Sequence, residues 1–150
     1  MFVWGIDLSG SLSGAGGVGG LLAILSPDSC LLSPVFDANG NVSEMLSALS
    51  SELSILAHYE YSPFGETIVA TGELAKENPY RFSTKYTDDE TKLVYYGYRF
   101  LSPDLGRWVS RDPIEEEGGL NLYVFVWNTP ILNFDPFGLE TKCCDEDVYN

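Results

Sequence analysis

The chain has 150 residues, of which 45% are hydrophobic and 13% aromatic, and its eight Lys and Arg stand against 22 Asp and Glu, which gives a net charge of −14. This composition is typical of a folded domain and not of a disordered protein. The acidity argues against nucleic acid or an anionic membrane as a partner, because both require clustered basic residues. The acidic residues are instead expected to form a solvated surface.

Short motifs do not indicate a membrane segment, a leader, a metal or a cofactor. The longest apolar stretch, residues 21–25, is far shorter than a membrane span. Asp7 interrupts the N-terminal apolar residues that a signal peptide would need, so none is expected. The three cysteines lack the spacing of a disulfide framework or a metal site. The glycine-rich stretch 14–20 lacks the Gly-Lys-Ser/Thr ending of a phosphate-binding loop.

The N-terminal third of the chain predicts short strands and hairpins, with one ambiguous segment. Residues 1–25 are expected to form strands broken by glycine. Asn39-Gly40 between apolar runs is typical of a type I′ turn, whose two central residues both need a positive φ. In residues 42–57 the apolar side chains recur at helical spacing, which on pattern alone predicts a helix, although serines and hairpin-like flanks weaken it.

From residue 59 onward the pattern indicates strands and turns. A turn is expected at residues 62–65, where proline is second and glycine fourth. The apolar segment 120–127 predicts a short helix or a buried strand, and the composition becomes polar and acidic after residue 139. Strands are expected over five segments: 59–61, 66–71, 80–86, 93–100 and 107–110.

Residues 59–65, with the sequence YEYSPFG, have the form of a YD repeat. Six further motifs follow: RFSTKY (81–86), YGYR (96–99), GRW (106–108), RDP (111–113), GLNLY (119–123) and DPFGL (135–139). Their order resembles that of the RHS repeat-associated core domain, which ends the shell of RHS/YD-repeat polymorphic toxins. The resemblance divides the chain into YD-repeat-like lead-in strands (1–58), the core domain (59–139) and a short polar tail (140–150).

The resemblance implies a mainly β fold, in which hairpins belong to a sheet that spirals into a hollow β-shell, and it favours two strands over a helix at residues 42–57. In full-length relatives a variable C-terminal effector follows the DPxGL motif and stays inside the shell after cleavage. The implied partners are the rest of such a shell and the effector. Self-association through unpaired sheet edges is also expected. The family suggests a secreted or cell-surface bacterial protein, but the location of this chain stays open.

The resemblance assigns self-cleavage to two aspartates, Asp112 and Asp135, with Arg111 beside the first and the scissile bond between Leu139 and Glu140. Two carboxylates that lie close together share one proton, so the ionised one can activate a water while the protonated one polarises the carbonyl. Arg111 would orient a carboxylate or stabilise charge. The chain would then be an aspartyl peptidase that acts once and only on itself.

Backbone geometry is expected to support this site. Pro113 and Pro136 fix φ after each aspartate, and Gly138 allows a tight bend before the cleaved bond. Glu115 occupies a position where the family usually has glycine, so the backbone there is expected to suit glycine. The alternative function is a non-cleaving structural or interaction remnant of an RHS protein, because residues 140–150 are too few to fold as an effector. Carbohydrate binding through exposed aromatic residues rests on analogy alone.

Overall fold

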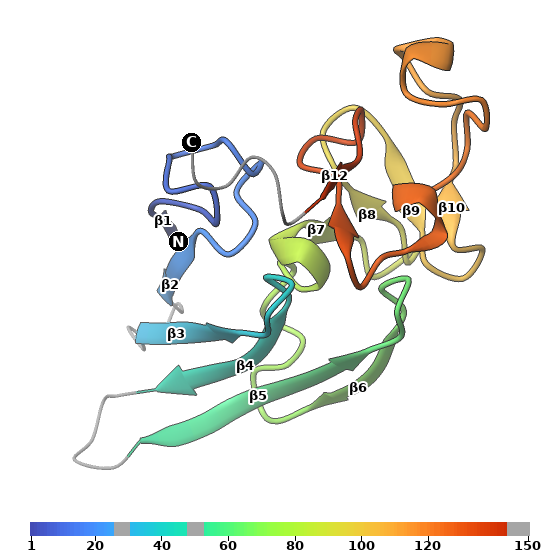
Figure 1. Ribbon diagram of the computed structural model, residues 1–150. Helices are drawn as coiled ribbons and strands as arrows, with labels where there is room; N and C mark the ends of the chain where they lie inside the picture. Colours follow the sequence, from blue (N-terminus) through green and yellow to red (C-terminus); the bar gives the residue numbers. More distant parts are fainter. Residues whose placement is uncertain (26–30, 48–52, 144–150) are drawn as a thin grey trace.

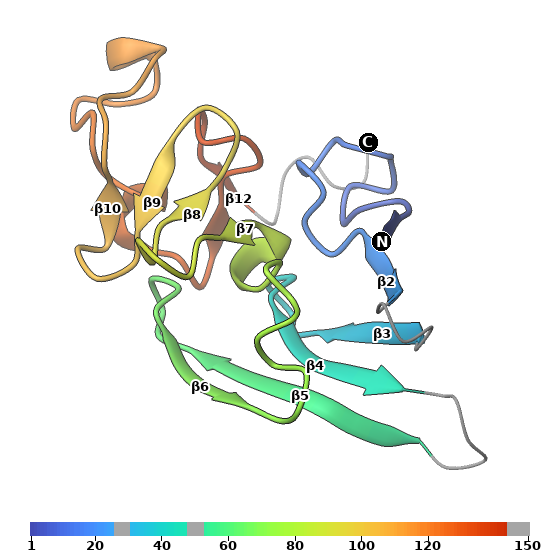
Figure 2. The same ribbon diagram turned by 180° about the vertical axis from the view of Figure 1, so that it is seen from behind.

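The computed structural model describes residues 1–25, 31–47 and 53–143, and these residues are mainly antiparallel β-structure (Figures 1 and 2). The mainly β fold class expected from the sequence is confirmed. Cys30, Cys144 and the tail beyond residue 143 lie outside the described residues. Six strands follow one another in the larger sheet: β1 (Phe2–Trp4), β2 (Leu21–Leu25), β3 (Leu31–Phe36), β4 (Val42–Ser47), β5 (Ser54–Tyr61) and β6 (Thr67–Thr71).

No helix among the described residues is long and apolar enough to cross a membrane.

A second sheet, a two-stranded pair and three short 3₁₀ turns make up the C-terminal half. The second sheet has the order β10-β9-β8-β7, with β7 (Tyr86–Thr87), β8 (Val94–Tyr95), β9 (Phe100–Ser102) and β10 (Arg107–Trp108). A third pair consists of β11 (Asn133–Phe134) and β12 (Lys142–Cys143), and the 3₁₀ turns are η1 (Phe82–Thr84), η2 (Glu115–Glu117) and η3 (Val126–Asn128).

Residues 42–57 contain strands β4 and β5 and not the helix that their spacing suggests. In the β3–β4 pairing, Val35 lies opposite Glu44 whereas Phe36 lies opposite Val42, so β4 carries one extra residue. Such a bulge shifts the alternation of side chains. Val42 and Met45 therefore both face the core, fully buried, although they are three residues apart. The bulge thus reproduces the apolar spacing of a helix within a strand.

The β3–β4 hairpin turns where the sequence predicts, but the predicted type I′ geometry is wrong. Gly40 has a φ of +73°, whereas Asn39 keeps a negative φ. The Gly40 N–H donates to the Asp37 carbonyl at 3.1 Å. The Asp37 carboxylate also accepts hydrogen bonds from the N–H groups of Asn39 and Asn41, at 2.9 and 3.0 Å. The aspartate thus stabilises a turn that needs only one left-handed residue.

Two of the longer predicted strands, 80–86 and 93–100, are interrupted. In the first, Ser83 lies in the left-handed region with a φ of 50°, and its N–H donates to the Asn41 side chain at 2.7 Å. In the second, the chain reverses at Gly97, which has a φ of +108°, before β9 begins at Phe100. The first interruption depends on a side chain from the distant β3–β4 turn, which local alternation does not reveal.

Residues 120–127 form neither a right-handed helix nor a strand. Leu120 is 91% exposed, and only Phe125 and Val126 are buried. Val126, Trp127 and Asn128 have φ values of 40°, 53° and 56°, so η3 is a left-handed turn. Left-handed backbone is costly for a β-branched residue. Burial of the two apolar side chains in the second core offsets that cost.

Two apolar cores lie on the two sheets, and Tyr61 packs against both. The core of the smaller sheet contains an aromatic cluster of Tyr96, Trp108 and Phe125. The Trp108 ring meets the rings of Tyr96 and Phe125 edge-to-face, with centroids 5.1 and 5.2 Å apart. Such edge-to-face contacts stabilise a core beyond the area they bury. The cluster forms the floor beneath the candidate site described below.

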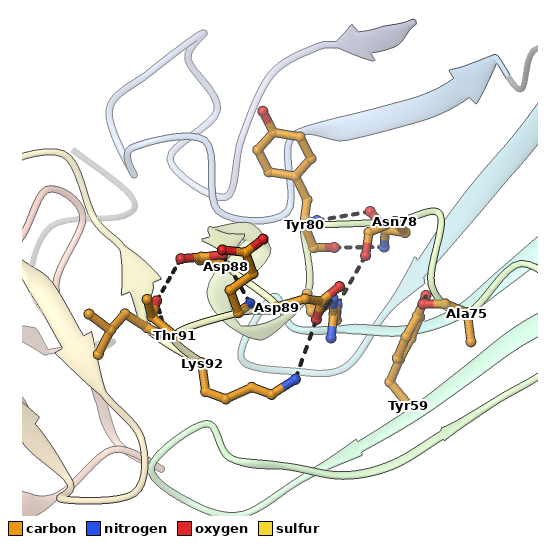
Figure 3. A network of polar contacts seen from close by, with 11 residues as sticks. Tyr59, Ala75, Asn78, Tyr80, Asp88, Asp89, Thr91 and Lys92 are labelled. Carbon is orange, nitrogen blue, oxygen red and sulfur yellow. Dashed lines mark hydrogen bonds and ion pairs between the residues drawn. The ribbon is translucent and has the colours of Figure 1, made fainter.

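A polar network in the loop between β6 and β7 fastens that loop to its surroundings (Figure 3). The Tyr59 hydroxyl of β5 donates to the Ala75 carbonyl at 2.8 Å. Arg81 donates from Nε to the Asn78 carbonyl at 3.0 Å, and its Nη2 lies 2.6 Å from Asp89 Oδ1. The segment that enters β7 is therefore held by hydrogen bonds from both sides.

Candidate self-cleavage site

Asp112 lies in the segment that follows β10, and only 8% of it is exposed. Its N–H donates to the Leu122 carbonyl at 3.0 Å, and its Oδ1 accepts the Ile114 N–H at 3.1 Å. Its Oδ2 lies 2.7 Å from Arg99 Nη1. Hydrogen bonds between ionised partners at this distance are among the strong ones in proteins. Main-chain contacts and one cation therefore fix the orientation of this carboxylate.

Asp135 directly follows β11 and is 2% exposed. Its Oδ1 accepts three main-chain hydrogen bonds, from the N–H groups of Phe137 at 3.0 Å, Gly138 at 2.6 Å and Leu139 at 3.1 Å. Gly138 has a φ of +77°, and a Cβ atom there would lie 3.1 Å from the Tyr96 Cβ. The cleavage loop, residues 135–139, thus curls around the carboxylate in the tight bend expected at Gly138.

Arg99 joins the two aspartates to the predicted scissile segment. Besides its contact with Asp112, its Nη2 lies 3.5 Å from Asp135 Oδ2. Its Nε donates to the Gly138 carbonyl at 2.6 Å, and its Nη2 donates to the Leu139 carbonyl at 3.4 Å. The guanidinium carbon lies 4.4 Å from the Trp108 ring centroid, a cation–π contact. Among the described residues no hydrogen bond directly joins the two carboxyl groups, so Arg99 bridges them.

Burial sets the electrostatics of this group. Loss of water raises the pKa of Asp135, and hydrogen bonds from three main-chain N–H groups together with the charge of Arg99 oppose that rise only in part. Burial likewise lowers the pKa of Arg99, and the two aspartates oppose that fall. The protonated form of Asp135 is therefore favoured more than it would be in an exposed aspartate, as general acid chemistry requires.

A second buried cation lies beside the cleavage loop. Lys85 donates from Nζ to the carbonyls of Gly16 and Pro136 at 2.5 and 2.6 Å. Burial lowers the pKa of Lys85 to about 8, although the negative charges of Asp135 and Asp7 favour its protonated form. Sequence reasoning attached no role to Lys85, because its partners are distant in the chain.

Arg111, which precedes Asp112 in the chain, points away from the buried carboxylates. Its side chain is exposed, and within the described ranges it makes no hydrogen bond or ion pair. Arg99, and not Arg111, contacts both carboxylates and so has the geometry for the charge-stabilising role that was expected for Arg111. Arg99 belongs to the YGYR motif at 96–99, which contributed to the family resemblance without a chemical role. The presence of an arginine in this otherwise aromatic motif was therefore the sequence feature from which Arg99 could have been identified as a site residue.

The remaining predicted residues differ in their exposure to solvent. Leu139 is half-buried and Glu140 is exposed, so the bond between them lies at the surface. Pro136 and Gly138 are buried in the cleavage loop, whereas Pro113 is exposed. The predicted scissile bond is therefore open to solvent, whereas Arg99, Asp112 and Asp135 are buried.

The turn after Asp112 has two features that matter for the carboxylate. Glu115 has a φ of 55°, which confirms the expectation that the backbone there suits glycine. At Gly118 a Cβ atom would lie 2.6 Å from Asp112 Oδ2. A side chain at position 118 would therefore displace the carboxylate. Sequence reasoning did not identify Gly118.

Comparisons with known proteins relate the chain to toxins, although no protein-family model matches it. It is 41% identical over 88 residues to toxin subunit YenC1 of Yersinia entomophaga, which covers 57% of this chain and 9% of the relative. It is 44% identical over 61 residues to toxin protein Tse5 of Pseudomonas aeruginosa, covering 41% and 5%. The crystal structure of TcdB2-TccC3 without its hypervariable C-terminal region matches with a TM-score of 0.65 and 38% identity, over 74% of this chain and 5% of that one. The chain thus spans less than a tenth of each of these proteins.

Proposed function

We propose that the chain is the RHS core module of a toxin-encapsulating β-shell and that it cleaves itself once, after Leu139, by means of Asp112, Asp135 and Arg99. The observation that carries the proposal is the bridge made by Arg99, which contacts both buried aspartates and the Leu139 carbonyl. Similarity to toxin proteins and to TcdB2-TccC3 supports the setting. In that setting the partners would be the rest of a shell and a C-terminal effector.

Each charged group has a place in the reaction. Arg99 Nη2 lies where negative charge develops when water adds to the Leu139 carbonyl carbon, so it can stabilise that oxygen. Asp112, the closer partner of Arg99 at 2.7 Å, takes the proton from the attacking water. Asp135 retains a proton more readily because burial raises its pKa, and it supplies that proton to the leaving nitrogen of Glu140. The carbon–nitrogen bond breaks, which leaves a carboxylate on Leu139 and an amine on Glu140.

The test is the intact mass of the expressed 150-residue chain over time. The wild type should lose the segment after Leu139, whereas Asp112→Asn and Asp135→Asn should keep it. Asp104→Asn, in an exposed turn, is the matched control and should cleave like the wild type. Near-ultraviolet circular dichroism would establish that all the variants are folded.

The same contacts also support a second function, a structural module that does not cleave. Three main-chain N–H groups and a buried cation satisfy Asp135, which is how proteins stabilise buried charge in a purely structural role. If the wild type and both site variants stay whole while folded, the structural function replaces the cleaving one.

A further inference from the structure

Lys85 connects three segments that are far apart in the sequence. It follows η1 and is 7% exposed. Its two hydrogen bonds reach Gly16, in the N-terminal glycine-rich loop, and Pro136, in the cleavage loop. In both ribbon views the blue N-terminal loop and the red C-terminal segment flank the green turn of η1 (Figures 1 and 2). The ammonium therefore lies where these two segments meet.

The glycine-rich loop is itself held in place. Asp7 accepts hydrogen bonds at Oδ2 from the N–H groups of Ala15 and Gly17, at 2.8 and 3.0 Å. The Gly19 N–H donates to Thr84 Oγ1 at 2.9 Å, which fastens the loop to η1. Between these anchors Gly16 presents its carbonyl to Lys85. These hydrogen bonds hold the glycine-rich loop in a fixed conformation, and the cleavage loop packs against it.

Gly16 tolerates no side chain. Its φ is +62°, and a Cβ atom there would lie 1.9 Å from the Pro136 carbonyl oxygen and 2.7 Å from Lys85 Nζ. Main-chain atoms cannot move aside as the end of a flexible side chain can. The cleavage loop and the glycine-rich loop therefore touch directly at Gly16 and Pro136, and Lys85 ties the two carbonyls together.

We propose that Lys85 and Gly16 are positioning residues for self-cleavage: Lys85 holds the Pro136 carbonyl, and Gly16 provides the space that lets the cleavage loop present Leu139 to Arg99. The inference rests on the proposed function. Because a displacement of about 1 Å can reduce a reaction rate about 10²-fold, release of Pro136 would separate the Leu139 carbonyl from the guanidinium. Self-cleavage then depends on the docking of the N-terminal loop as well as on the core.

The first experiment measures loop position without cleavage, in an Asp112→Asn chain. Hydrogen exchange and proton shifts of the Phe137, Gly138 and Leu139 amides would be followed by NMR, because these amides donate to Asp135. Lys85→Met and Gly16→Ala should accelerate their exchange at least tenfold and shift the Gly138 proton upfield. The amides of β4 and β5 should not change. Unchanged loop amides in both variants would overturn the proposal.

Matched controls are available for each variant. Gly10 has a φ of +73°, but a Cβ atom there meets nothing within 4 Å, so Gly10→Ala isolates the backbone cost. Lys92, whose side chain is 75% exposed, provides Lys92→Met as a control for loss of a lysine charge. Both controls should leave the loop amides unchanged. If Lys85→Met does not fold, amide exchange in Gly16→Ala compared with Gly10→Ala still tests the proposal.

The second experiment measures the self-cleavage rate by intact mass with Asp112 present. Lys85→Met and Gly16→Ala should cleave at least tenfold more slowly than the two controls. Faster amide exchange with an unchanged cleavage rate would show that these residues do not position the reaction. A wild type that never cleaves would contradict the proposed function, whereas the exchange experiment would still decide whether Lys85 and Gly16 hold the loop.

Discussion

At the scale of single residues, Arg99 is the one cation within the described part of the chain that contacts both Asp112 and Asp135. Arg99→Met leaves two carboxylates buried without their shared cation, and breaking a buried ion pair costs about 3–5 kcal/mol. We expect this variant to lose at least a hundredfold in self-cleavage and to unfold at lower urea concentration. Arg111→Met, at an exposed position, should stay within twofold of the wild type. If both variants lost self-cleavage equally, Arg99 would have no special role, and Arg111 would again be a candidate for the catalytic positive charge.

Lys85 should make the free energy of unfolding depend on pH in the alkaline range. Because burial lowers its pKa to about 8, the unfolded chain binds more protons than the folded chain between about pH 8 and the ordinary lysine value of 10.5. Its charged form costs stability below pH 8, and that cost is relieved as pH rises through this window. The stability of the wild type relative to Lys85→Met should therefore increase by up to about 3 kcal/mol. Urea unfolding at several pH values, with Asp112→Asn in both chains, measures this difference, and a flat difference would contradict it.

Glu115 carries a backbone cost that glycine would remove. Left-handed backbone costs a non-glycine residue roughly 1–2 kcal/mol, and the extra freedom of glycine in the unfolded chain returns part of this. At its φ of 55°, Glu115→Gly should stabilise the chain by roughly 0.5–1 kcal/mol. Glu116 is also exposed but has a negative φ, so Glu116→Gly should destabilise. Thermal unfolding of the pair measures both signs.

At the scale of elements, the β3–β4 turn packs against the N-terminal loop. A Cβ atom at Gly40 would lie 2.5 Å from Val18 Cγ1 and 3.0 Å from Leu8 Cδ1. Gly40 and Gly10 share a φ of +73°, so both alanine variants pay the same backbone cost of roughly 1–2 kcal/mol. Gly40→Ala should lower the melting temperature further than Gly10→Ala, because Val18 must also move. Equal melting temperatures would mean that the two segments do not pack together in solution.

The sequence predicts elements where their causes are local and misses them where a distant residue intervenes. The turn at residues 62–65 forms as predicted, with the Gly65 N–H bonded to the Ser62 carbonyl at 2.9 Å, because proline and glycine determine it locally. Residues 80–86 do not form the predicted strand, because the Asn41 side chain binds Ser83. The aspartates were found through their motifs, but the role of Arg99 depends on contacts with Trp108, with Asp112 and with the cleavage loop.

At the scale of the whole molecule, the candidate site draws on the N-terminal loop between β1 and β2, on segments that flank the strands of the second sheet, and on the loop between β11 and β12. Gly16 and Lys85 contact the cleavage loop at Pro136, and Arg99, which is paired with Asp112, contacts it at Gly138 and Leu139. Gly16 is 69 residues before Lys85, and Lys85 is 51 residues before Pro136. Assembly of the site is thus a property of the folded chain and not of its aspartate motifs.

The edges of the large sheet should make the chain associate when salt screens its charge. The outer strand β6 exposes Ile68, which is 65% exposed, and β6 pairs only with β5 among the described strands. Unpaired edges bind other strands, whereas a net charge of −14 keeps copies apart. Charge repulsion reaches about 10 Å at 0.1 M salt and about 3 Å at 1 M. Sedimentation velocity should therefore show monomers at low salt and dimers at high salt.

Two isoleucine variants distinguish pairing at the β6 edge from non-specific association through exposed apolar surface. Ile68→Lys places a charge on the β6 edge, which natural sheets use to prevent pairing. Ile131→Lys makes the same change in charge at a loop residue that is 66% exposed and outside every sheet. At high salt we expect Ile68→Lys to remain monomeric and Ile131→Lys to dimerise like the wild type. If both variants remain monomeric, association depends on exposed apolar surface or net charge, and the β6 edge is not the contact between copies of the chain.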